Sequence, residues 1–284
     1  MTRISAHCLV KNEARFIWYS LNSVIKLVDR LRITDTGSTD NTIAIIKKFI
    51  QSTKDPSRII FEQFSSEENF DEKKYRDQML NADIKSNDMD WFLIIDGDEI
   101  WWDKSIEEVV KTITKEGDKI ESIIVPVRNL VGDMYHYQEE VAGKYQFENL
   151  PRGHYNLRAF RKNIPGLYSK GEYGVFGWYD KDNKMIQERG SSKVRFINSP
   201  YIHTTHLLRS NLRLKDWEVI QRKKKYKYEI GISFPKDYYY PEVLFRAKPD
   251  DLEDIWQKTN INYRFRALIE TPFKLIKRRL LSNG

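Results

Sequence analysis

The chain has 284 residues, of which 40% are hydrophobic and 31% are charged, with nine prolines, a composition that excludes intrinsic disorder and collagen-like repeats. Its longest apolar runs, such as residues 91–95, are far shorter than the ~18–20 residues of a membrane-spanning helix. The 48 basic and 41 acidic residues leave a net charge of +7, which favours anionic partners.

The start of the chain and its single cysteine bear on the compartment. Residues 1–5 lead directly into a strand-like pattern and lack the apolar core and cleavage site of a signal peptide. Cys8 alone cannot form an internal disulfide, which fits a reducing environment. We therefore expect a cytoplasmic protein, and the length allows one large or two small domains, since a typical domain has ~150 residues.

The first third of the chain alternates between predicted strands and predicted helices. Apolar residues at three-to-four-residue spacing predict helices, and short apolar runs bounded by turn residues predict strands. Because residues 91–95 are apolar at every position, we expect helices on both faces of that strand. The pattern predicts an α/β fold with a Rossmann-like, mostly parallel central sheet flanked by helices. The expected order is strand 3–10, helix from 12, strand 30–34, helix from 38, strand 57–64, helix 72–84 and strand 91–95.

The pattern changes at about residue 128. From there to residue 210, glycines and aromatic residues predict loops and short strands. After residue 210, apolar residues at helical spacing predict a helical C-terminal extension over 211–284. These apolar residues are Leu214, Trp217 and Ile220, followed by Leu252, Ile255 and Trp256.

Polar residues follow three of the predicted strands at the points where the strands end. They are residues 11–13, 35–40 and 96–99. Ligands of open α/β sheets bind outside the carboxyl ends of the strands, so we expect these three segments to meet at one site. Neither a dinucleotide-binding Gly-x-Gly-x-x-Gly pattern nor a phosphate-binding Gly-x-x-x-x-Gly-Lys loop is present, which disfavours dehydrogenases and P-loop enzymes.

Two carboxylates, Asp96 and Asp98, flank Gly97 directly after the apolar strand. Such a pair suits a hard divalent cation that keeps open positions for phosphate oxygens and water. The alternative is an Asp-Gly turn with solvated acids. For residues 35–42, a nucleotide contact and a merely structural capped turn both remain open.

These motifs resemble those of family-two glycosyltransferases, which are inverting enzymes with the GT-A fold. The matching segments are residues 8–13, 35–42 and 92–99, the last of which contains the family's Asp-x-Asp signature. Residues 74–78 resemble a helix that often carries an Arg-Asn pair near the nucleotide, whereas Asp35-Thr36 replaces two adjacent acids. The resemblance implies a GT-A domain over 1–210, with a nucleotide-binding half at 1–128 and an acceptor-binding half at 129–210.

The resemblance also implies roles for individual residues. A nucleoside-diphosphate sugar would contact Asn12, Glu13, Asp35, Arg76 and Asp96. A manganese or magnesium ion would bridge its diphosphate to Asp96 and Asp98. In relatives a late histidine adds a metal ligand, and His206 occupies the matching segment, although for both His206 and His203 a hydrogen-bonded histidine in a partly buried strand is the alternative.

Inversion requires a carboxylate that takes the proton of an attacking acceptor hydroxyl. In relatives a Phe-Arg segment precedes the glutamate that does this. Here Phe160-Arg161 precedes Glu172, the preferred candidate, although the expected histidine is missing and the spacing is shortened. The competitors are Asp133, Glu139, Glu140 and Asp180. The acceptor would be a glycan, a lipid-linked molecule or a protein.

Two basic segments lie outside these motifs. Residues 222–228 mix basic and aromatic residues, a pattern more typical of a solvated helix face than of a nucleic-acid surface, so we expect no nucleic acid. Residues 261–281 predict a basic amphipathic helix that Pro272 kinks or divides. It would dock on the core, which we favour slightly, or lie in a membrane interface and make the protein peripheral to a membrane.

Two other functions remain as alternatives to an inverting, metal-dependent glycosyltransferase. A sugar nucleotidyltransferase would favour a glycine-rich, lysine-containing phosphate segment near the N-terminus, and residues 10–13 lack those glycines. A noncatalytic carbohydrate- or nucleic-acid-binding protein would not hydrolyse sugar nucleotides.

Overall fold

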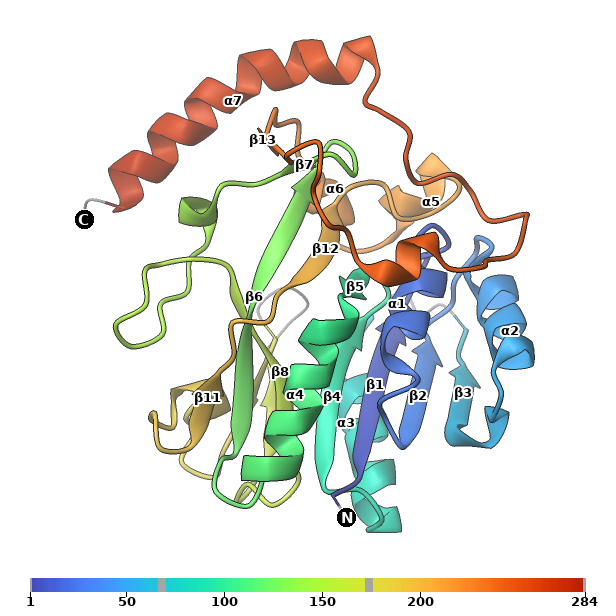
Figure 1. The fold of residues 1–284 in the computed structure, drawn as a ribbon, viewed down its shortest axis with the longest axis vertical. Helices are drawn as coiled ribbons and strands as arrows, with labels where there is room; N and C mark the ends of the chain where they lie inside the picture. The colour runs from blue at the N-terminus through green and yellow to red at the C-terminus, as the bar shows by residue number, and fades with distance from the viewer. Residues whose placement is uncertain (1, 66–69, 172–175, 283–284) are drawn as a thin grey trace.

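The computed structural model describes residues 2–65, 70–171 and 176–282 (Figure 1). The predicted α/β class is confirmed. The α-helices are α1 (Ile17–Val24), α2 (Thr42–Ser52), α3 (Glu72–Ser86), α4 (Asp103–Glu116), α5 (Arg213–Glu218), α6 (Arg222–Lys225) and α7 (Ile261–Ser282). The longer strands are β1 (Ile4–Val10), β2 (Arg30–Asp35), β3 (Ile59–Gln63), β4 (Trp91–Asp96), β6 (Ser122–Val131), β8 (Tyr155–Arg161) and β12 (Tyr201–His206).

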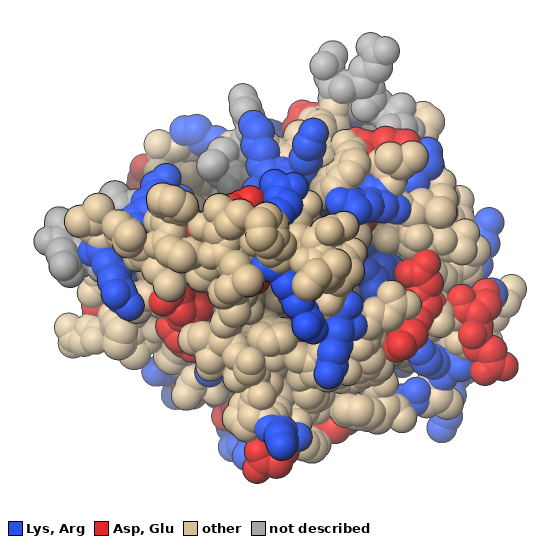
Figure 2. All heavy atoms as spheres, turned by 90° about the horizontal axis from the view of Figure 1, so that it is seen from above, with Lys and Arg blue, Asp and Glu red and all other residues tan. Residues whose placement is uncertain are grey.

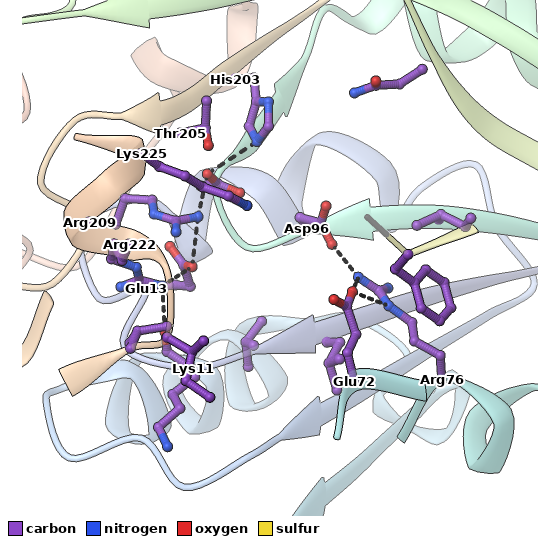
Figure 3. A pocket seen from close by; sticks show the side chains of 18 of the residues that line it. Lys11, Glu13, Glu72, Arg76, Asp96, His203, Thr205, Arg209, Arg222 and Lys225 are labelled. Carbon is purple, nitrogen blue, oxygen red and sulfur yellow. Dashed lines mark hydrogen bonds and ion pairs between the residues drawn. The ribbon is translucent and has the colours of Figure 1, made fainter. Parts of the chain in front are cut away.

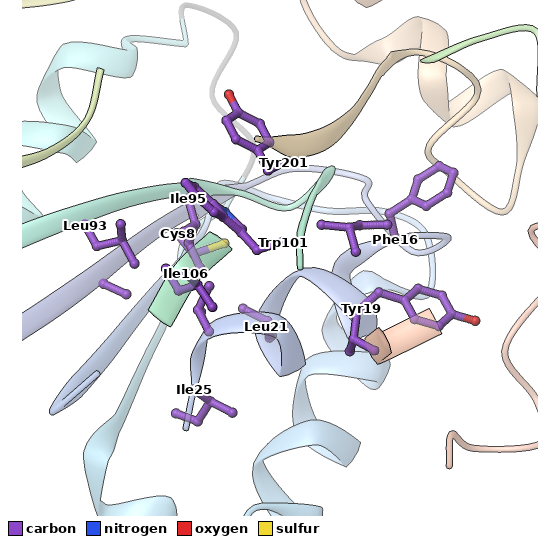
Figure 4. Packing of buried hydrophobic residues seen from close by; sticks show 14 of the residues in the cluster. Cys8, Phe16, Tyr19, Leu21, Ile25, Leu93, Ile95, Trp101, Ile106 and Tyr201 are labelled. Atoms are coloured by element: carbon purple, nitrogen blue, oxygen red, sulfur yellow. The ribbon is translucent and has the colours of Figure 1, made fainter. Parts of the chain in front are cut away.

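The first half of the chain forms a parallel sheet in the order β4-β1-β2-β3. Helices α1, α2 and α4 cover one face, and α3 covers the other (Figure 1). Strand β4 is buried on both faces, as predicted, because Leu93 and Ile95 pack in one hydrophobic cluster while Phe92 and Ile94 pack in another. Cys8 is a core residue beside Ile95 and Trp101 (Figure 4).

The second half extends the same sheet with mixed strand directions. Strand β8 runs antiparallel between β4 and β6, and β12 pairs in parallel with β6. The expectation of short strands after residue 128 misses β8, which has seven residues. The short strands are β5 (Glu99–Trp101), β7 (His136–Tyr137), β9 (Tyr168–Lys170), β10 (Gly177–Tyr179), β11 (Val194–Phe196) and β13 (Ile232–Ser233).

The C-terminal part is less helical than predicted. Residues 226–260, all of them described, contain a single short 3-10 helix, η4 (Glu242–Phe245), and no α-helix. Leu252 and Ile255 pack into the main core from this irregular segment, so their apolar spacing does not mark a helix. Pro235, Pro241 and Pro249 interrupt the region, and a proline removes a backbone donor.

Helix α7 then runs along one end of the molecule (Figure 1). The helix continues through Pro272, so the proline does not divide it. Of the helices in the described residues, none combines the length and the hydropathy that a membrane span requires.

Candidate active site

A cavity of about 650 Å³ lies at the carboxyl ends of β1 and β4. Its wall brings together segments that are far apart in the chain (Figure 3). Of the predicted residues, Glu13, Arg76, Asp96 and Asp98 line it. Its other charged or polar residues include Lys11, Thr36, Glu72, Asn156, Arg158, His203, Thr205, Arg209, Glu218, Arg222 and Lys225.

Asp96 and Asp98 lie at the turn after β4, and both are held in the ionised form. Asp96 Oδ1 accepts a hydrogen bond from Arg76 Nη2 at 2.7 Å. Burial alone would raise the pKa of Asp98, but the Arg209 charge and a hydrogen bond with His203 outweigh it and hold the pKa well below its usual range. Asp98 is 1% exposed, so a turn with solvated acids is wrong for this residue.

Gly97 allows this turn to pack tightly against the end of β1. A Cβ atom at this position would lie 2.8 Å from Glu13 Cγ and 3.1 Å from Val10 Cγ1. Real Cβ atoms do not approach other carbons so closely, so a larger residue would displace Glu13 or the turn itself. The glycine is therefore required for the close approach of the two segments.

The donor set fits a divalent cation that takes most of its ligands from a substrate and water. Asp98 Oδ1 is buried and has no hydrogen-bond partner among the described residues, and Asp98 Oδ2 lies 3.3 Å from His203 Nε2. The described residues contain no group of three or more acidic, histidine or cysteine side chains arranged to hold a metal. Magnesium sites commonly use one or two carboxylates together with substrate phosphates, and this turn offers the two carboxylates.

A buried charge cluster joins the end of β1 to the C-terminal part of the chain. Arg222 Nη2 bonds Glu13 Oε1 at 2.6 Å, and Arg209 Nη1 lies 3.1 Å from the same oxygen. Arg222 Nη1 also bonds Asp216 Oδ1 at 3.1 Å, and Arg209 contacts Asp98. Burial raises the pKa of Glu13 to about 8 despite both arginines, because three carboxylates share two guanidinium groups.

Two further arginines line the cavity near Asp96. Arg76 on α3 is buried between Asp96 and Glu72, and its Nη1 has no partner among the described residues (Figure 3). Arg158 on β8 bonds Glu99 and lies 3.9 Å from Asp96. Buried guanidinium groups favour anionic ligands, and planar donors match the geometry of phosphate oxygens.

Asn12 and Asp35 do not belong to the wall of this cavity. Asn12 adopts a left-handed conformation at φ 54°, and its Oδ1 accepts a hydrogen bond from Thr39 N at 2.8 Å. Asp35 Oδ1 accepts bonds from the backbone N–H groups of Gly37 and Ser38 at 3.0 and 2.9 Å. These contacts order the turn after β2, while Asp35 Oδ2 is buried without a hydrogen-bond partner among the described residues, so the nucleotide contacts of Asn12 and Asp35 stay predictions.

The two histidines of β12 point in different directions. His203 lines the cavity beside Asp98, whereas His206 is not among the lining residues. His206 Nδ1 donates to Lys225 O at 2.7 Å, and its Nε2 accepts from Lys227 Nζ at 3.1 Å. Because successive residues of a strand alternate between its faces, residues 203 and 205 share the cavity side. His203, and not the predicted His206, therefore lies beside Asp98 in the cavity wall.

Glu172, the predicted base, lies outside the described residues. The segment that follows it reaches the cavity, since Phe176, Gly177 and Trp178 line the wall. The four competing acids are absent from that wall. Each has a side-chain partner elsewhere: Asp133 is hydrogen-bonded with His136, and ion pairs join Glu139 to Arg278, Glu140 to Arg128 and Asp180 to Arg189.

The sequence prediction missed two arginines of the wall. Arg158 lies within strand β8. Arginine is rarely buried without a charged partner, so an arginine in a core strand indicates a buried ion pair. Arg222 belongs to the basic run expected to be a solvated helix face. Lys223 and Lys224 are exposed, as that interpretation requires, but Arg222 is buried and Lys225 lines the cavity.

Several solved structures are distantly similar to this chain. TarS (1–349) from S. aureus is 14% identical, with a TM-score of 0.45 over 79% of this chain and 71% of that chain. A mycobacterial protein is 16% identical, with a TM-score of 0.45 over 71% and 67%. Glucosyl-3-phosphoglycerate synthase from Mycobacterium tuberculosis, crystallised with Mn²⁺, UDP and glucosyl-3-phosphoglycerate, is 21% identical, with a TM-score of 0.32 over 46% and 45%.

The sequence itself gives the family. No curated protein matches the chain. Residues 5–181, more than half of the chain, match the model of glycosyl transferase family 2 and contain all three motifs on which the resemblance rests. The chain therefore belongs to glycosyltransferase family 2 and is a nucleotide-sugar-dependent glycosyltransferase.

Proposed function

We propose that the protein is a metal-dependent, inverting glycosyltransferase that moves a sugar from a nucleoside diphosphate to an acceptor hydroxyl. One observation carries the proposal. The cavity wall holds an ionised carboxylate oxygen, Asp98 Oδ1, and a guanidinium nitrogen, Arg76 Nη1, that have no hydrogen-bond partner among the described residues. Each group has an ion-pair partner through its other atoms, but a buried polar atom without a hydrogen bond is costly, and a metal-bound diphosphate would supply a partner to both atoms.

The residues of the chain would divide the work as follows. Asp98 and Asp96 would hold a manganese or magnesium ion, which when bound supplies Lewis-acid stabilisation of the departing diphosphate. Arg76 and Arg158 would orient the diphosphate oxygens, since their guanidinium groups are fixed by Asp96, Glu72 and Glu99. His203 lies where it could contact either the metal or a phosphate.

Inversion follows from attack on the face opposite the leaving group. The acceptor oxygen would form a bond to the anomeric carbon while the bond from that carbon to the diphosphate oxygen breaks. The acceptor proton would pass to a carboxylate, for which Glu172 remains our candidate. Aromatic residues of the wall, Tyr145, Tyr155 and Trp178, offer surfaces on which a sugar ring could stack.

A thermal-shift panel of nucleoside diphosphates, with and without Mn²⁺, tests nucleotide binding first. A ligand at a hundredfold excess over its Kd raises the free energy of unfolding by about 2.7 kcal/mol. We expect stabilisation that needs both nucleotide and metal, and its metal-dependent part should disappear in Asp98→Asn. The matched control is Asp182→Asn, because Asp182 is exposed and outside the cavity.

Slow donor hydrolysis then separates an enzyme from a binding protein. We expect wild type and Asp182→Asn to hydrolyse the preferred sugar nucleotide in Mn²⁺, and Asp98→Asn to lose this activity. Metal-dependent binding without hydrolysis or transfer would support the noncatalytic alternative, and a preference for a nucleoside triphosphate with a sugar phosphate would support the nucleotidyltransferase. Near-normal transfer by Glu172→Gln would exclude Glu172 as the base.

A further inference from the structure

Helix α7 contacts the rest of the protein along one narrow side. Tyr263 Oη donates to the carbonyl oxygen of Lys227 at 2.8 Å, and Thr271 Oγ1 accepts from the backbone N–H of Ile230 at 3.0 Å. Arg278 forms ion pairs with Glu229 and Glu139 at 2.7 and 2.9 Å. Tyr263 and Thr271 are buried, as is Ala267 between them. The helix therefore docks on the protein, as expected, and does so through its polar and small residues.

The large apolar residues of α7 are on the other side. At roughly 100° per residue they lie on one face opposite the docked side, a face that Asn262 and Arg279 share near the two ends of the helix. Their exposed fractions lie between 52% and 73%, which means that no described part of the chain covers them. These residues are Phe265, Leu268, Ile269, Phe273, Ile276 and Leu280. An exposed stripe of this size, organised along one helix, marks an interaction surface.

Basic residues border this stripe on both of its edges. Arg264 lies along one edge, and Arg266 and Lys277 lie along the other, all three exposed. The single acid of the helix, Glu270, already pairs with Lys274 at 2.8 Å and with Arg266 at 3.3 Å. In Figure 2, which looks onto the end of the molecule that carries α7, Lys and Arg side chains surround a band of other residues.

The basic residues at its edges indicate which kind of partner covers the stripe. A second copy of α7 packed face to face would bring basic edges against basic edges, which is unfavourable. An anionic lipid surface instead offers hydrocarbon to the stripe and negative headgroups to its edges. We propose that α7 binds the surface of an anionic membrane, lying parallel to it with the apolar stripe inserted at the boundary between headgroups and acyl chains.

This surface is connected to the candidate active site by a short stretch of chain. Lys225 lines the cavity, and Lys227 and Glu229 contact α7 directly. The carboxyl ends of β1 and β4, where the cavity lies, also point toward the end of the molecule that carries α7 (Figure 1). Membrane binding would therefore hold the cavity on the side of the protein that faces the lipid.

Co-sedimentation of the full chain with vesicles tests the proposal without any nucleotide, so its outcome is independent of the proposed reaction. We expect binding to vesicles of equimolar phosphatidylcholine and phosphatidylglycerol, and much weaker binding to pure phosphatidylcholine. Added salt should reduce the difference, because it screens the attraction between the basic edges and the headgroups.

Two double variants separate the contributions of the stripe and its edges. Phe265→Gln with Phe273→Gln should weaken binding on the order of a hundredfold, given the transfer free energy of two phenylalanine side chains. Arg264→Gln with Lys277→Gln should weaken binding to the anionic vesicles roughly thirtyfold. All four side chains are exposed, so the variants should unfold at the wild-type temperature.

Matched controls carry the same changes elsewhere. Phe245→Gln removes an equally exposed phenylalanine, and Lys47→Gln with Lys104→Gln removes two charges from α2 and α4. Neither control should change binding by more than twofold, a small effect on the scale of one buried side chain. Wild-type binding by the phenylalanine variant would overturn the proposal. A lack of vesicle binding by the wild type would also overturn it. If the wild type instead formed a dimer in solution that the phenylalanine variant dissociates, a second copy would cover the stripe.

Discussion

Replacing Arg222 with methionine tests whether the buried charge cluster holds the end of β1 in place. The Arg222 side chain is 2% exposed and makes four hydrogen bonds. Two go to the carbonyl oxygens of Lys11 and Asn12, at 2.7 and 2.5 Å, and two go to carboxylates, those of Glu13 at 2.6 Å and Asp216 at 3.1 Å. Methionine keeps much of the volume and removes every donor.

The expected loss follows from leaving buried acceptors without partners. Arg222 pairs with the buried Asp216, and removing one member of a buried ion pair destabilises a protein by about 3–5 kcal/mol. Glu13 retains Arg209, and Asp216 retains the backbone N–H of Arg209. We therefore expect a loss of about 4 kcal/mol in the free energy of unfolding, a large part of the 5–15 kcal/mol typical of a domain.

Denaturant unfolding followed by circular dichroism measures this loss. The control is Lys223→Met, the same removal of a cation one residue away at an exposed position, which should change stability by at most about 0.5 kcal/mol. Adding Glu13→Gln to the variant should cost less than the two single changes together, because the partners interact directly. If Arg222→Met unfolds within about 1 kcal/mol of wild type, the cluster does not stabilise this loop as we infer.

Three further predictions concern other buried groups. Gly97→Ala should lower the free energy of unfolding by about 1–3 kcal/mol and weaken nucleotide binding, since its Cβ would lie 2.8 Å from Glu13 Cγ; unchanged melting and affinity would contradict the tight turn. Burial lowers the pKa of His154 from 6.5 to about 4, so the folded protein favours the neutral ring and loses stability as the pH falls from 6.5 toward 4. Relative to His154→Gln, wild type should lose about 2 kcal/mol more between about pH 7.5 and pH 5, and parallel pH profiles would refute this. The Cys8 thiol, 0% exposed and with its pKa raised by burial, should react with a disulfide reagent only after denaturation; rapid labelling of the native protein would show that the strand opens.

The parallel half of the fold could be predicted because its signals are local. Strand β4 is apolar at each position from Trp91 to Ile95, and such a run requires cover on both faces. Its polar end, together with the order of the motifs, also predicted that Asp96 and Asp98 would lie at the site. These inferences need only the rule that the carboxyl ends of parallel strands share one edge.

The rest of the site depends on pairings that no local pattern contains. Arg158 lines the cavity because β8 lies antiparallel between β4 and β6. Arg222 lines it because the C-terminal part of the chain packs beside Glu13. His203 and His206 differ only in the face of β12 that each occupies. Their spacing of three residues predicts that the two side chains lie on opposite faces of the strand. The strands that pair with β12 determine which of the two lies beside Asp98.

The reach of the Arg222–Glu13 contact also bears on synthesis at the ribosome. The two residues are separated by 209 positions, and Arg209 is nearly as distant from Glu13. While the nascent chain is still shorter than this, Glu13 must emerge from the exit tunnel without the arginines that it contacts in the folded protein. The pocket would thus be completed only after residue 222 has been synthesised and has left the tunnel, and we expect the nascent chain to lack nucleotide affinity until then.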